Sequence, residues 1–346
     1  MYNKFNTKII LGTSKLGWNL HRNEINKFLS VINYAAINNI KLHVSCLYGN
    51  SIDILSKNLE KKNYSNYLLK IFFKDKISFF HQISYFIETL SIKEPFDIQI
   101  DEYSDYKNIK EINLCIKYLK TNNLIKNVYF TPIRFSSKLF TKFFLSNCNI
   151  ALHFSLVERE FNNSFLIKNK KKIIALRAFG GSLNNFFFSD FNEFNSKCNL
   201  IRKNNLEKIL LKYDLSEVEA RAQYILKHRL IDYCIFSTRS LKNFKQLLFF
   251  EKKKFNKKVW NELDLYSNNA GCSFKSKEKY NIDRKNFFFI NNNYYKLMKS
   301  LNILNNNAKQ KINVSMTYFI MFYFYYPLNL INKLKLFTVL YINKIK

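Results

Sequence analysis

Glycine and proline are scarce in this chain, which has 6 glycines and 3 prolines in 346 residues. No Gly-x-Gly-x-x-Gly turn is present, and its absence disfavours a doubly wound nucleotide-binding sheet, whose first strand such a turn usually follows. The six cysteines stand far apart, without a Cys-x-x-Cys pair or the Cys/His spacing of a metal site. This spacing excludes a small disulfide-rich domain and fits a reducing cytoplasm, which is the expected location.

Long apolar segments are also missing. The apolar run before Gly12 is too short for a signal peptide, and no stretch reaches the roughly 18 uninterrupted apolar residues of a membrane span. The nearest candidate is Met316 to Leu328, which is short and contains Pro327. Core packing or a dimer contact is the favoured interpretation of that segment, with a membrane surface as the alternative. We therefore expect no transmembrane span.

Acidic residues are few, since 25 Asp and Glu stand against 56 Lys and Arg and give a formal charge of +31. A charge of this size raises the possibility of a nucleic-acid or anionic membrane partner. However, the abundant Lys, Asn, Ile, Phe and Tyr share AT-rich codons, and the lysines are spread along the whole chain. A genomic base bias explains this composition better than a binding face does, so no specific nucleic-acid partner is expected.

The pattern that predicts the fold is a regular alternation of strands and helices. Short β-branched or aromatic runs are each followed by a longer segment with helical spacing, which indicates parallel strands joined by crossover helices. Eight such units occur in a length close to the about 250 residues of a (β/α)8 barrel. The fold class is therefore α/β, a TIM barrel. The predicted strands are residues 8–11, 41–45, 67–73, 96–101, 127–131, 150–155, 172–178 and 232–237.

The barrel is expected over residues 1–268, and a C-terminal extension of unknown role over 269–346. After about residue 268 the chain becomes polar and then rich in Asn and aromatic residues, without a further barrel unit. We expect this extension to be helical or partly ordered. Chemistry in such barrels lies on the loops that follow the strands. The predicted helices are residues 23–39, 52–62, 76–91, 109–122, 137–146, 206–212, 216–228 and 240–252.

Five segments, in order, resemble the signature of the aldo-keto reductase family. The first two are ILGTSKLGW (10–18) and HVSCLYGNSIDILSKNL (43–59). The other three are HFSLVERE (153–160), IIALRAFGGSL (173–183) and IFSTRSLKNFKQLL (235–248). Each motif alone is weak, but their order and spacing cover residues 8 to about 255. The chain resembles a divergent member of that family.

The resemblance implies hydride transfer from NADPH to a small carbonyl substrate. Such chemistry needs a proton donor near the carbonyl oxygen and a cation that lowers the pKa of that donor. The family's Tyr falls on Tyr48 and its Lys on Lys70. A lysine inside the apolar third strand is costly unless it is paired or functional. The alternative is a solvent-facing lysine at the strand end.

Two further catalytic positions of the family have changed. The Asp that pairs with the Lys falls on His43, and the His near the carbonyl falls on Asp101 or Glu102. A carboxylate at the end of the fourth strand could pair with Lys70 and restore the charge balance. We expect one of the two acids within about 4 Å of the Lys70 ammonium. The alternative is that both acids are solvated strand-end residues.

The nicotinamide pocket implied by the resemblance is eroded, and the phosphate end is better preserved. Thr131 replaces a serine, whereas Pro132, Ala151 and Leu176 stand where the family has an amide, a glutamine and a large aromatic. The turn 237–240 offers hydroxyls, a guanidinium and a helix N-terminus to an anion; the alternative is an ordinary polar turn. Asn243 and Leu247 replace family contacts. The candidate cofactor residues are Gly12, Thr13, Thr131, Arg177, Ser237, Thr238, Arg239, Ser240 and Gln246.

Three classes of function stay open. The first is an active NADPH-dependent reductase that uses Tyr48 and Lys70. The second is a catalytically degraded barrel, a pseudoenzyme that kept the scaffold. The third, supported by bulk composition alone, is a basic protein that binds nucleic acid or a membrane surface.

Overall fold

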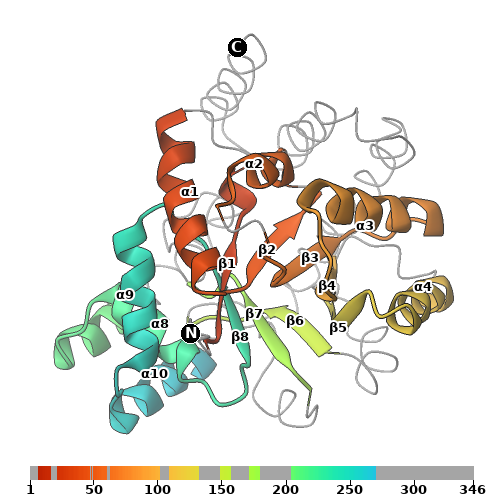
Figure 1. The fold of residues 1–346 in the computed structure, drawn as a ribbon. Helices are drawn as coiled ribbons and strands as arrows, with labels where there is room; N and C mark the ends of the chain where they lie inside the picture. Colours follow the sequence, from red (N-terminus) through yellow and green to blue (C-terminus); the bar gives the residue numbers. More distant parts are fainter. Residues whose placement is uncertain are drawn as a thin grey trace, which may run out of the picture.

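The strands of this protein form a closed parallel barrel in sequence order, β1 to β8 (Figure 1). The computed structural model describes residues 7–16, 22–46, 48, 50–60, 63–101, 109–131, 149–156, 171–179 and 204–269. The predicted (β/α)8 barrel is confirmed. The strands are β1 (Ile9–Gly12), β2 (Leu42–Ser45), β3 (Tyr67–Ile71), β4 (Phe96–Ile100), β5 (Ile125–Phe130), β6 (Asn149–His153), β7 (Ile173–Leu176) and β8 (Tyr233–Phe236).

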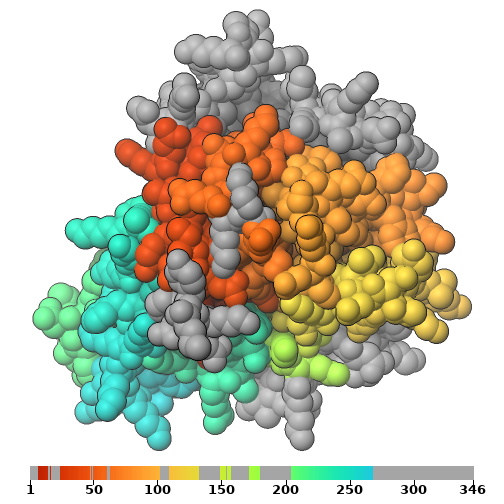
Figure 2. Space-filling view, viewed as in Figure 1, coloured from red at the N-terminus to blue at the C-terminus, as the bar shows by residue number. Residues whose placement is uncertain are grey.

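The described helices lie around part of the barrel, and in Figures 1 and 2 they pass from α8–α10 through α1 and α2 to α3 and α4. Each predicted helix within the described ranges is present, whereas the one expected over 137–146 lies outside them. The helices are α1 (Arg22–Ile37), α2 (Ser51–Asn58), α3 (Lys76–Leu90), α4 (Ile109–Thr121), α8 (Glu217–Leu226), α9 (Leu241–Lys252) and α10 (Lys257–Asn269), with a 3-10 turn η1 (Ser14–Leu16) and a further helix over 204–212. Among the described residues, no helix is long and apolar enough to cross a membrane.

Alternate residues of the strands face the outside and the inside of the barrel, because strand side chains point to opposite faces with a period of two. The outer core packs the strands against the helices and includes Leu11, Leu69 and Ile98. The inner core fills the barrel with Ile10, Leu68, Tyr129, Ala151 and Ile174, against which Leu176, Tyr233 and Ile235 pack. Burial on both faces explains why the strands read as nearly continuous apolar runs.

Local sequence signals fix where several helices begin. The Asp75 carboxylate accepts from the Ser78 amide at 2.7 Å, and the Ser78 hydroxyl accepts from the Asp75 amide, which forms a capping box at the start of α3. Ser216 and Ser240 cap α8 and α9 by accepting with their side-chain oxygens from the amides of Glu219 and Asn243.

The helix α10 closes the described part of the chain and packs on α8 through aromatic side chains. Tyr224 stacks between Phe154 and Trp260, with ring centroids 6.4 and 5.7 Å away. The Tyr224 hydroxyl donates to Asp264 at 2.8 Å, and the Trp260 indole donates to the Tyr224 carbonyl at 3.1 Å. The barrel unit therefore extends to Asn269. Residues 270–346 lie outside the described ranges, so an extension over 269–346 stays a prediction.

Candidate functional site

Lys70 and Asp101 form an ion pair inside the carboxyl end of the barrel. Lys70 Nζ lies 3.1 Å from Asp101 Oδ2, and the exposed fractions of the two side chains are 17% and 2%. Lys70 is on the inward row of β3 with Leu68, and Asp101 directly follows β4. The predicted contact between Lys70 and a fourth-strand carboxylate is confirmed, and the alternative of a solvent-facing lysine is wrong. Glu102 lies outside the described residues.

Tyr48 lies in the turn that leads from β2 into α2. Its amide donates to the Ser45 carbonyl and its carbonyl accepts from the Ser51 amide, both at 3.1 Å. Burial raises the pKa of the Tyr48 hydroxyl, while the Lys70 charge acts in the opposite direction and Asp101 adds to the rise. The expected lowering by Lys70 is therefore present but outweighed by desolvation. In the free protein this hydroxyl keeps its proton.

His43 lies on β2 beside Tyr48 and is almost completely buried. The two rings meet edge to face, with centroids 5.8 Å apart and an interplanar angle of 78°. Burial, and then the Lys70 charge, lower the pKa of His43 to about 3, against a smaller opposing effect of Gln99. The imidazole is therefore neutral at physiological pH. Its Nε2 has no hydrogen-bond partner.

Replacing His43 by glutamine is expected to reduce the acid sensitivity of folding. The unfolded chain takes up a proton near pH 6.5 whereas folded His43 does so only near pH 3, so stability falls as the pH drops through this window. At pH 5 the loss due to this group is about 2 kcal/mol relative to neutral pH. Urea unfolding at pH 7.5 and pH 5 should give a smaller difference for His43→Gln. An identical difference in both proteins would contradict the assignment.

Gln99 is a polar residue of the barrel interior that the sequence did not single out. Its Nε2 donates to Thr131 Oγ1 at 2.9 Å, while its Oε1 is buried without a hydrogen-bond partner. The signal was available in the sequence, because Gln99 and Asp101 alternate on the inward face of one strand. The hydroxyl of Thr131, a candidate cofactor residue, is thus oriented by a neighbouring strand. Pro132 lies outside the described residues.

The turn after β8 leads into α9, as predicted, but three of its side chains, those of Thr238, Arg239 and Ser240, already have partners within the protein. Ser240 Oγ caps α9 by accepting from the Asn243 amide at 3.3 Å, and Thr238 Oγ1 accepts from the Ser240 amide at 3.2 Å. Arg239 Nη1 pairs with Glu24 Oε1 at 2.6 Å, and both side chains are about two-fifths exposed, at 42% and 40%. A surface pair of this kind contributes little stability, so an anionic ligand can compete for the guanidinium.

Ser237 Oγ is buried without a hydrogen-bond partner. It lies beside Gly12 of β1, where a Cβ atom added to the glycine would be 3.8 Å from Ser237 Cβ. Thr13 is fully buried and donates from Oγ1 to the His43 carbonyl at 2.9 Å. Arg177 is exposed after β7 with a φ of 50°, and Gln246 is exposed on α9. The structure therefore brings Gly12 and Ser237 together at the carboxyl ends of β1 and β8.

Replacing Gly12 by alanine is expected to destabilise the barrel by about 1 kcal/mol. The added Cβ would lie 3.2 Å from Ile235 Cγ2 and 3.4 Å from the Phe236 carbonyl, so the two adjacent strands must move apart slightly. Urea unfolding would measure the change. A neutral substitution would show that close strand packing is not the reason for glycine at this position.

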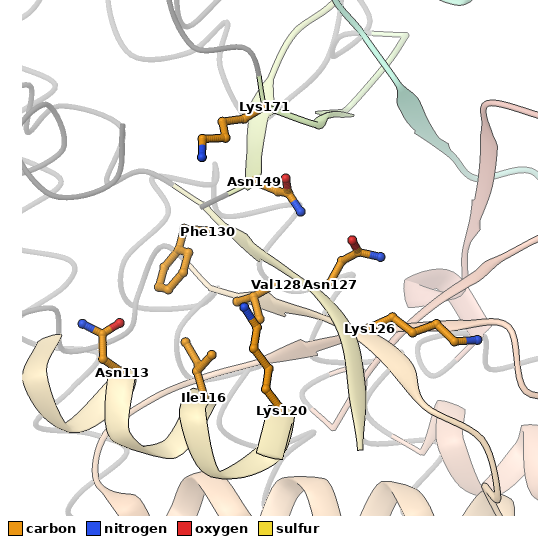
Figure 3. A pocket seen from close by; sticks show the side chains of 9 residues that line it. All are labelled: Asn113, Ile116, Lys120, Lys126, Asn127, Val128, Phe130, Asn149 and Lys171. Carbon is orange, nitrogen blue, oxygen red and sulfur yellow. The ribbon is translucent and has the colours of Figure 1, made fainter. Parts of the chain in front are cut away.

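A cavity of about 270 Å³ lies elsewhere, on the outer wall of the barrel against α4 (Figure 3). Val128 and Phe130, which belong to the outer core, form part of its wall. Lys126 and Asn149 line it from the amino-terminal halves of β5 and β6. The cavity is thus outside the barrel interior that holds Lys70, and we do not assign the candidate chemistry to it.

The whole fold resembles solved aldo-keto reductase structures. The glycerol dehydrogenase AKR11B4 from Gluconobacter oxydans matches with a TM-score of 0.58 and 17% identity, over 80% of this chain and 97% of that chain. An aldo-keto reductase from Klebsiella pneumoniae in complex with NADPH matches with a TM-score of 0.57 and 12% identity, over 75% and 91%. At the level of sequence, no protein-family model and no curated protein matches. The chain has an aldo-keto reductase-like fold.

Proposed function

We propose that this aldo-keto reductase-like barrel is an oxidoreductase that uses NADPH to reduce a small carbonyl substrate. The observation that carries the proposal is the buried ion pair of Lys70 and Asp101, at 3.1 Å, at the carboxyl end of the barrel. A buried pair is costly to desolvate and is weak evidence for stability, so its position at the functional end of the fold favours a chemical role. The charges of both residues influence Tyr48.

In this mechanism NADPH, when bound, supplies the hydride that reduces the carbonyl carbon. Tyr48 donates its hydroxyl proton to the carbonyl oxygen, and Lys70 stabilises the phenolate that forms. Asp101 keeps Lys70 protonated inside the barrel. Because burial raises the pKa of Tyr48, its hydroxyl is protonated before the reaction, as a proton donor requires.

The residues at the ends of β1 and β8 fit a dinucleotide. Ser237 Oγ is a buried hydroxyl without a hydrogen-bond partner, and Gly12 lets the two strands approach closely. We propose that Ser237, Thr238 and Arg239 hold the phosphates near the N-terminus of α9, and that Gly12, Thr13, Thr131, Arg177, Ser240 and Gln246 line the remaining cofactor site. Arg239 would exchange Glu24 for a phosphate.

A non-catalytic barrel is the second candidate. It is favoured by Ala151, a buried side chain without a polar group where the resemblance implies a glutamine, and by a neutral imidazole at position 43. In such a protein the barrel would keep a binding or structural role. Its Lys70–Asp101 pair would be a remnant.

Titration with NADPH, followed by protein fluorescence, separates these candidates. Quenching by NADPH together with its oxidation by members of an aldehyde and ketone panel is expected. Quenching without oxidation by any carbonyl would favour the non-catalytic barrel. If NADPH does not bind at all, the proposed reductase is wrong, and so is a non-catalytic barrel that keeps the nucleotide site. Arg239→Met should weaken binding, whereas Lys253→Met, which removes a similarly exposed cation at the opposite end of α9, should not.

A further inference from the structure

The two strands that flank β3 supply different groups to Lys70. The register pairs Lys70 with Ser45 of β2 on one side and with Gln99 of β4 on the other. From the β4 side, Asp101 approaches Lys70 Nζ to 3.1 Å with only 2% of its side chain exposed. From the β2 side, the inward residues are Ser45, which donates from Oγ to the Lys70 carbonyl at 2.9 Å, and His43, which is 5% exposed. The carboxylate therefore reaches the lysine from β4.

His43 carries no charge that could balance Lys70. Burial, and then the charge of Lys70, lower the pKa of His43 to about 3, so the imidazole is neutral at physiological pH. Its ring meets the Tyr48 ring edge to face at 5.8 Å. A smaller, opposing effect on this pKa comes from Gln99 of β4, whose Nε2 donates to Thr131 Oγ1 at 2.9 Å. The imidazole thus contacts the Tyr48 ring and lies near Gln99 of β4.

We propose that the carboxylate and the imidazole of this site have exchanged strands around Lys70. In this arrangement Asp101 of β4 sets the charge state of Lys70, and His43 of β2 is a positioning residue that holds the Tyr48 ring. Resemblance to the aldo-keto reductases implies the opposite placement, with the carboxylate on β2 and the imidazole after β4. The expected effect on turnover rests on the proposed function, whereas the pairing of Lys70 with Asp101 does not depend on it.

If the two groups have exchanged places, a single substitution at position 43 or 101 should impair the site, and the double substitution should restore much of what each single one loses. Asp101→His leaves the buried ammonium without this carboxylate, and His43→Asp adds a second carboxylate next to the first. The double variant His43→Asp/Asp101→His again has one carboxylate and one imidazole at these two positions. Such compensation appears as a coupling between the two substitutions in a double-mutant cycle.

The experiment follows the titration of Lys70 by NMR in protein labelled with ε-¹³C-lysine, with the Lys70 signal assigned by its loss in Lys70→Met. Asp101→His is expected to lower the Lys70 pKa by about one unit or more, and the double variant should recover most of that shift. Lys41 is the internal control, because its partner Asp97 is untouched. If the double variant titrates like Asp101→His alone, the exchange is wrong.

Turnover is measured on the same four proteins with the carbonyl panel. Each single variant is expected to lose about 100-fold in kcat/KM, and the double variant to recover at least tenfold of that loss. Absence of turnover in all four proteins, including the unmodified one, would reject the proposed function while the Lys70 titration still decides the exchange. If Asp101→His does not fold, the milder pair Asp101→Asn and His43→Asp/Asp101→Asn makes the same comparison, since it also moves a carboxylate from the end of β4 to β2.

Discussion

Replacing Tyr48 by phenylalanine is expected to reduce carbonyl-dependent oxidation of NADPH by about 10²- to 10⁴-fold or more, with little change in NADPH affinity. The substitution removes the proposed proton donor, and general acid catalysis contributes a factor of this size. The ring itself is retained, so its edge-to-face contact with His43 persists. Steady-state kinetics with the best substrate of the panel, combined with fluorescence titration of NADPH, would measure both quantities.

The matched control for this variant is Tyr118→Phe. Tyr118 lies on α4, is 56% exposed and packs its ring on Phe80. Removal of its hydroxyl should change neither turnover nor affinity. If Tyr48→Phe retains full turnover, another group donates the proton and the assignment of Tyr48 is wrong. If turnover and NADPH affinity fall together, Tyr48 is a binding residue instead.

The barrel was predictable for two reasons. Most strand side chains are apolar on both faces of the sheet, and capping residues in the sequence mark where several connecting helices begin. Leu68 and Leu69, for example, face the inner and outer cores in turn, so most strands read as short apolar runs. The helix α10 was missed, although Val259, Leu263 and Tyr266 are buried at helical spacing. The polar residues between these three positions conceal the apolar spacing in the sequence. The helix is stabilised by the stacking of Trp260 on Tyr224 of α8.

Of the candidate site, the ion pair of Lys70 was predictable but the electrostatics were not. The resemblance placed a lysine within an apolar strand and an acid, Asp101 or Glu102, at the end of the next strand, and Asp101 forms the expected pair. The net rise in the pKa of Tyr48 could not be foreseen, since it depends on how deeply the turn after β2 is buried. The pairing of Arg239 with Glu24 likewise depends on the position of α1, which no local pattern encodes.

The opposite end of the barrel interior is also charged, and there the charge has a structural role. Lys41, just before β2, forms an ion pair with Asp97 of β4, whose side chain is 2% exposed. Asp97 Oδ1 accepts from the Asn127 backbone amide at 3.1 Å and from its Nδ2 at 2.7 Å. Lys41 Nζ also lies 5.1 Å from the centre of the Tyr233 ring. One carboxylate thus connects β2, β4 and β5 at the amino end, where maintaining stability rather than chemistry is the usual task of barrel residues.

Replacing Asp97 by alanine is therefore expected to lower the free energy of unfolding by about 3–5 kcal/mol, the cost of leaving a partner charge inside the barrel uncompensated. The same carboxylate also satisfies two donors of Asn127, which adds to the loss. Urea unfolding followed by circular dichroism would measure this loss.

Lys253→Met is the control, because it breaks the exposed pair with Glu219 and should cost no more than about 1 kcal/mol. Lys41→Met combined with Asp97→Leu should recover part of the stability, since the pair is then replaced by apolar groups. Equal losses for Asp97→Ala and Lys253→Met would contradict the structural role of the buried pair.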